Sequence, residues 1–130
     1  MSPRPDPSPV VLAAPALRGR VACVDLETTG GMALHHRVIE FGIVLLEDGV
    51  VVEQWSSLVN PGVRVPSSIE AFTGITNEMV ADAPSFEELH GEVRRRLDGC
   101  LFVAHNARFD YGFVRNEFRR LGDRFAAPVL

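Results

Sequence analysis

The feature that most constrains the fold is the run VACVDL at residues 21–26, in which every residue except Asp25 is apolar. A strand that lacks alternating polar residues belongs in a sheet covered on both faces. The turn sequence TTGG at residues 28–31 ends this run. We therefore expect a buried strand that carries an acidic side chain near its carboxyl end.

Two more β-rich runs follow at residues 38–46 and 50–59, and they are joined by Glu47, Asp48 and Gly49. An Asp-Gly pair between apolar runs predicts a tight hairpin. The first half of the chain therefore supplies three strands, of which at least two are antiparallel.

Helical signals dominate the second half. Ser67 with Glu70, and Ser85 with Glu88, match the capping-box pattern that begins helices. A short apolar strand at residues 100–104 precedes a longer helix, whose apolar stripe is Ala107, Tyr111, Val114, Phe118 and Leu121. The order β-β-β-α-α-β-α predicts a mixed α/β sheet with flanking helices, in which a crossover makes the last strand parallel to the first.

Length and composition fit one globular domain, because the chain has 130 residues of which 46% are hydrophobic. We expect residues 1–19, which are rich in proline, to be disordered, and residues 20–130 to form the domain. Residues 128–130 look like the start of another strand, so we expect the domain to be incomplete at its C-terminus. No apolar run approaches the ~18 residues of a membrane span, and two unpaired cysteines fit a cytoplasmic protein.

Charge is unevenly distributed along the chain. Residues 21–90 contain two arginines and eleven acidic residues, whereas residues 91–124 contain eight arginines and five acidic residues. An acidic half that holds cations beside a basic segment that holds phosphates would suit an enzyme that uses metal ions on a polyanion, but the charge pattern taken alone favours an ordinary solvated surface.

Three acidic residues are the candidates for chemistry. Asp25 and Glu27 are two residues apart at the end of the first strand, so both side chains point to the same face. Asp110 lies near the start of the last helix, which follows a strand expected beside the first. A hard divalent cation would relieve the repulsion between such carboxylates. The alternatives are two solvated acids at a sheet edge and a helix N-terminal acid favoured by the helix dipole.

Two segments carry a resemblance to a known family. Residues 24–30 (VDLETTG) resemble the first motif of the DEDD exonucleases, and residues 105–110 (HNARFD) resemble their second motif. Residues 66–76 (PSSIEAFTGIT) are similar to the segment that the family carries between the two motifs. Residues 20 to 130 as a whole resemble the proofreading (epsilon) subunit of bacterial DNA polymerase III.

The resemblance implies a ribonuclease H-like fold and a metal-dependent 3′-5′ exonuclease that acts on the single-stranded 3′ end of DNA, with RNA also open. It implies two ions, Mg²⁺ or Mn²⁺, on Asp25, Glu27 and Asp110. It further implies an enzyme that is either free-standing or the proofreading partner of a DNA polymerase subunit, and the lack of a long apolar run predicts no membrane partner. The positions expected to touch the substrate are Thr28, Thr29, Thr73 and Asn106, with Arg108 for a phosphate.

The family's third motif, with a general-base histidine and a fourth aspartate, has no counterpart among the 20 residues after Asp110. The sequence therefore also predicts an alternative: an inactive fragment, or a module that binds single-stranded nucleic acid or a polymerase without cleaving. An unrelated α/β domain with coincidental acids is a third interpretation.

Overall fold

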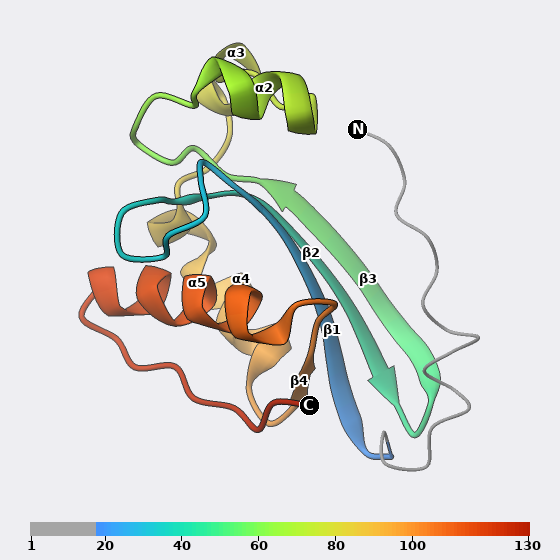
Figure 1. Ribbon diagram of the computed structural model, residues 1–130. Helices are drawn as coiled ribbons and strands as arrows, with labels where there is room; N and C mark the ends of the chain where they lie inside the picture. The colour runs from blue at the N-terminus through green and yellow to red at the C-terminus, as the bar shows by residue number, and fades with distance from the viewer. Residues whose placement is uncertain (1–17) are drawn as a thin grey trace.

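The computed structural model describes residues 18–130, so most of the segment predicted to be disordered lies outside the described residues. The strands are β1 (Arg20–Thr28), β2 (Val38–Glu47), β3 (Val50–Leu58) and β4 (Leu101–Val103). The helices are α2 (Ser67–Thr73), α3 (Asn77–Ala81), α4 (Phe86–Leu97) and α5 (Ala107–Arg120). The four strands form one sheet in the order β3-β2-β1-β4 (Figure 1).

The sheet has the predicted mixture of directions. β1 pairs antiparallel with β2, and β2 pairs antiparallel with β3. The hairpin turn between β2 and β3 has positive φ at both Asp48 (50°) and Gly49 (82°), which is the geometry that an Asp-Gly turn supplies. β4 is parallel to β1, with Cys23 opposite Val103, so the crossover prediction is confirmed.

The end of the described chain runs beside β4. The Phe102 N–H donates to the Pro128 carbonyl at 2.8 Å, and the Leu130 N–H donates to the Phe102 carbonyl at 3.0 Å. Residues 128–130 therefore pair with β4 as a parallel bridge at Val129, in agreement with the strand character expected of them.

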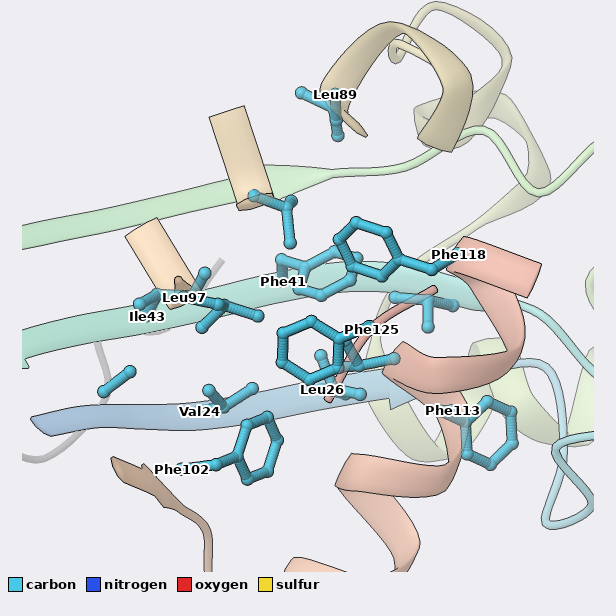
Figure 2. Close-up of a cluster of buried hydrophobic side chains, with 14 of the residues drawn as sticks. Val24, Leu26, Phe41, Ile43, Leu89, Leu97, Phe102, Phe113, Phe118 and Phe125 are labelled. Atoms are coloured by element: carbon cyan, nitrogen blue, oxygen red, sulfur yellow. The ribbon is translucent and has the colours of Figure 1, made fainter. Parts of the chain in front are cut away.

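Helices α4 and α5 pack on the same face of the sheet (Figure 1). Val24 and Leu26 of β1 and Phe41 and Ile43 of β2 point from the sheet into a cluster of aromatic rings (Figure 2). That cluster includes Phe86, Phe102, Phe113, Phe118 and Phe125, all of them buried. Burying several large aromatic side chains, at about 1.5–3 kcal/mol each, is the main force that holds α4 and α5 on the sheet.

The opposite face of β1 is buried only in part, whereas the sequence predicted burial on both faces: Val21 is fully buried there in a small apolar cluster with Leu46. Cys23 is half-buried there, and Asp25 is exposed. Because alternate residues of a strand face opposite sides, an almost continuous apolar sequence cannot show which side is covered.

The helix starts were predicted with mixed success. Ser85 caps α4 and forms the predicted capping box with Glu88. Ser67 does not cap α2, which has Pro66 at its N-cap position, and the Glu70 carboxylate instead accepts from the Asn77 backbone N–H at 2.8 Å. The short helix α3 was not predicted separately. Within residues 18–130 no helix has both the length and the apolar character needed to cross a membrane.

Candidate active site

Asp25 and Glu27 lie on one face of β1, as the spacing predicts. Asp25 is opposite Gly42 of β2, which has no side chain to cover it, and Asp25 is exposed. Glu27 is half-buried and opposite Glu40, a carboxylic acid that is only 1% exposed. This end of the β1–β2 ladder therefore gathers acidic side chains, one of which is deeply buried.

Asp110 is in the first turn of α5 and is 7% exposed. Burial raises the pKa of its carboxyl group to about 6, and the negative charges of Asp25 and, less strongly, Glu27 add to the rise. Hydrogen bonds from the backbone at Asp110 itself and at Leu26 act in the opposite direction. The three predicted acids thus lie near enough to influence one another, with Asp110 next to the strand that carries the other two.

The donor set of this site consists of carboxylate oxygens, which are the ligands that hard divalent cations prefer. A cation between these groups would also offset the repulsion that raises the pKa of Asp110. Within residues 18–130, however, no three His, Cys, Asp or Glu side chains stand close enough together to form a ready-made metal site. The chemistry fits a divalent cation, and binding would require the side chains to draw together.

A cleft of about 340 Å³ opens beside Glu27. It lies between the end of β1, the following loop, α2 and the start of α5. Its lining residues are Leu26, Glu27, Thr28, Gly30, Gly31, Ile69, Phe72, Thr73 and Phe109. The cleft thus combines apolar and aromatic walls with a carboxylate at one side.

The predicted substrate residues separate into three groups. Thr28 and Thr73 line the cleft, and their hydroxyl groups donate to the carbonyl groups of Gly30 and Ile69, respectively. Thr29 is buried behind the cleft, where its hydroxyl oxygen accepts from the Arg37 backbone N–H at 3.0 Å. Asn106 and Arg108 are exposed at the start of α5.

Sequence reasoning missed two aromatic side chains of the cleft. Phe72 is 86% exposed, although large apolar residues are normally buried. Phe109 is half-buried, packs against the core cluster and also lines the cleft.

Comparison with known proteins places this site in a family. The family model described as Exonuclease matches residues 22–128, which include all three acids. The chain belongs to the exonuclease family. It is 40% identical over 104 residues to the 3′-5′ exonuclease DinG of Bacillus subtilis, covering 79% of this chain and 11% of that protein. It is 36% identical over 106 residues to the PolC-type DNA polymerase III of Clostridium perfringens, covering 82% of this chain and 7% of that protein. The chain thus spans about a tenth of the length of these curated relatives or less.

Solved structures of exonuclease I share the fold of this exonuclease-family chain. A product-bound structure of exonuclease I has a TM-score of 0.75 and 18% identity, covering 82% of this chain and 27% of that chain. A complex of the Escherichia coli enzyme with single-stranded DNA gives the same TM-score and covers 25% of that chain. The ribonuclease H-like fold predicted from the sequence is therefore confirmed.

Proposed function

We propose that this protein is a metal-dependent 3′-5′ exonuclease that hydrolyses terminal phosphodiester bonds at the single-stranded 3′ end of DNA. The observation that carries the proposal is the position of Asp110 in the first turn of α5, where the charges of Asp25 and Glu27 help to raise its pKa, beside a cleft that Glu27 itself lines. A nucleic-acid end in this cleft would bring its terminal phosphodiester bond next to the carboxylates.

The cleft suits a terminal nucleotide. Phe72 and Phe109 provide aromatic surface, and stacking on such side chains contributes about 1–3 kcal/mol per base without sequence preference. The Thr28 and Thr73 hydroxyl groups provide polar atoms in the same wall. Arg108 is exposed one turn or less from Asp110 and is our candidate for binding a phosphate.

Asp25, Glu27 and Asp110 would hold Mg²⁺ or Mn²⁺. When bound, such cations supply positive charge that stabilises the charge developing on the phosphate during hydrolysis. The role of the protein's own residues is to set the geometry: β1 fixes Asp25 and Glu27 on one face, and α5 brings a buried carboxylate to the same strand end.

The relatives suggest a context for this activity. PolC-type DNA polymerase III contains a segment similar to this chain, which supports a proofreading role beside a polymerase. The similarity to DinG supports a 3′-5′ exonuclease that is part of a different kind of protein. We favour DNA as the substrate, and the experiment below includes RNA.

The test uses single-stranded DNA and RNA oligonucleotides labelled at the 5′ end, incubated with the protein and Mg²⁺, Mn²⁺ or EDTA. We expect a ladder of shortened DNA with either cation, none with EDTA, and a loss of at least ~10²-fold in rate for Asp25→Ala. Asp82→Asn, at the exposed C-terminal end of α3, is the matched control and should retain full activity. Cleavage that is equal in wild type and Asp25→Ala would rule out the proposed site.

Binding without cleavage is the second candidate function. It is favoured by the exposed aromatic side chain of Phe72 in the cleft, together with the lack, within residues 18–130, of three acidic, histidine or cysteine side chains already close enough to hold a metal ion. A wild-type chain that retains 5′-labelled DNA in a mobility-shift assay but leaves its length unchanged would support this candidate over the exonuclease.

A further inference from the structure

An ion pair with a buried carboxylate connects the two halves of the candidate site. Glu117 lies two helical turns after Asp110 on α5, and its side chain is only 1% exposed. Arg37, just before β2, donates to it from Nε at 3.0 and 3.1 Å and from Nη2 at 2.7 Å. The Val38 backbone N–H also donates to the carboxylate, at 3.0 Å.

Arg37 is in turn tied to the segment that follows the catalytic acids of β1. Its backbone N–H donates to the Thr29 hydroxyl oxygen at 3.0 Å, and its carbonyl accepts from the Thr29 N–H at 2.8 Å. Glu27 is only two residues before Thr29. The carboxylate of Glu117 is thus linked through one arginine to the end of β1.

Arg120 extends the connection over the loop between β1 and β2. Its Nη2 atom donates to the carbonyl oxygens of Ala33, Leu34 and His36 at 3.2 to 3.4 Å. Its Nη1 atom lies 3.6 Å from the Glu117 carboxylate. We call Arg37, Glu117 and Arg120 the clamp, because they fasten the β1–β2 loop to α5.

Stability alone does not account for the clamp. Burying the Glu117 carboxylate removes a charge from water at a cost of several kcal/mol, and apolar pairs of similar size often replace buried ion pairs with equal or greater stability. Multiple hydrogen bonds differ from apolar contacts because they fix the direction and distance of the groups they join. A clamp built in this way restricts how α5 rotates or slides against the loop.

We propose that Glu117 is a positioning residue, which through Arg37 and Arg120 holds α5 and the β1–β2 loop in the orientation that places Asp110 against Asp25 and Glu27. This inference rests on the proposed exonuclease function for its catalytic consequence. The loop also forms part of the cleft at Gly30 and Gly31, so the clamp sets one wall of the cleft as well.

The decisive variant replaces the pair by apolar residues, Arg37→Met with Glu117→Leu, and Arg37→Lys is the second variant in case the double variant does not fold. Arg37→Lys keeps the charge but loses the two-pronged contact. The matched control is Asp123→Asn, which removes another carboxylate held by an arginine, here Arg94 at 2.9 and 3.1 Å, away from the β1–β2 loop. For each we would measure the Tm, kcat, KM and the binding of Mn²⁺ alone by electron paramagnetic resonance.

We expect the double variant to unfold cooperatively at a lower Tm, because the Val38 N–H loses its acceptor, with kcat lowered by about 10²-fold, as for a small displacement of catalytic groups, and with weaker Mn²⁺ binding. Arg37→Lys should lower kcat and weaken Mn²⁺ binding in the same direction. Asp123→Asn should lower the Tm and leave kcat and Mn²⁺ binding unchanged.

A folded double variant, or a folded Arg37→Lys protein, with wild-type kcat and wild-type Mn²⁺ binding would overturn the positioning role. Failure of the proposed function has a different signature, namely a wild-type protein that does not shorten DNA at all. In that case the positioning role is tested by Mn²⁺ binding and by the backbone amide NMR signals of residues 25–29 and 110. If those signals in Arg37→Lys match the wild-type spectrum and Mn²⁺ binding is unaltered, the clamp does not position the acids.

Discussion

The position of Asp110 predicts that the candidate site lowers the stability of the metal-free protein. The pKa of its carboxyl group is raised from 3.8 to about 6 by burial and by the charges of Asp25 and Glu27. Each pKa unit corresponds to about 1.4 kcal/mol, so ionisation of Asp110 costs about 3 kcal/mol more in the folded chain than in the unfolded chain. Replacement by asparagine keeps the size and shape of the side chain and removes this cost.

The sign of the pH dependence follows from the raised pKa. Between about pH 4 and pH 6 the folded chain holds the Asp110 proton more tightly than the unfolded chain does, so this group makes stability fall as pH rises through that range. The Asp110→Asn variant does not titrate there. We therefore expect it to be up to about 3 kcal/mol more stable than wild type at pH 7.5, with the difference disappearing near pH 4.

The assay is urea unfolding in EDTA at several pH values, followed by the fluorescence of Trp55, the single tryptophan, which packs against the core from β3. Asp123→Asn serves as the opposite control, because His90 and Arg94 hold the pKa of Asp123 below its usual range. That variant should lose stability at neutral pH. An Asp110→Asn protein that is no more stable than wild type at pH 7.5, or whose advantage does not change with pH, would refute the reasoning.

Two further predictions concern the cleft and the hairpin. Phe72→Ala should raise KM for single-stranded DNA several-fold, as expected for the loss of about 1 kcal/mol of stacking. The Tm should not fall, because this side chain is 86% exposed. An unchanged KM in steady-state kinetics would contradict the assignment of Phe72 to the cleft. Gly49→Ala should lower the free energy of unfolding by about 1 kcal/mol, because a residue with a side chain is strained at the φ of 82° found there. The variant should keep the wild-type kcat. A urea unfolding curve with an unchanged midpoint would contradict the predicted loss of stability.

The parts of the fold that depend on neighbouring residues were predictable from the sequence. The Asp48-Gly49 turn has only a few backbone conformations available to it, and Ser85 and Glu88 satisfy each other's backbone groups within one turn of helix. Such signals need no knowledge of the rest of the chain. The parallel direction of β4 was predicted differently, from the order of the strands and helices along the chain.

The predictions that were wrong involve competition from residues farther away. Glu70 was expected to cap its own helix with Ser67, but it binds the start of the next helix at Asn77, which sequence spacing does not reveal. Which face of β1 is covered depends on where α4 and α5 pack. The sequence of the strand does not reveal this, because it places apolar residues on both faces.

The site shows the same division between local and distant information. The spacing of Asp25 and Glu27 and the position of Asp110 were sufficient to select the three acids. The burial of Asp110 and the contact of Glu117 with Arg37, 80 positions earlier in the chain, arise only when the helix lies against the sheet. Both carboxylates are buried, and the sequence pattern selects Asp110 but gives no sign of the contact that Glu117 makes.

The structure treats these two buried acids of α5 in opposite ways. Glu117 accepts hydrogen bonds from a two-pronged arginine and a backbone N–H, so the fold itself compensates its charge. Asp110 faces two more negative charges, which raise the cost of ionising it. A buried charge that the protein compensates contributes to structure, whereas one whose neighbours oppose it is best compensated by a positively charged ligand. Glu117 and Asp110 are only two turns apart on α5, but Glu117 sets the geometry and Asp110 is suited to bind a cation. The contacts of Glu117 therefore determine where Asp110 lies.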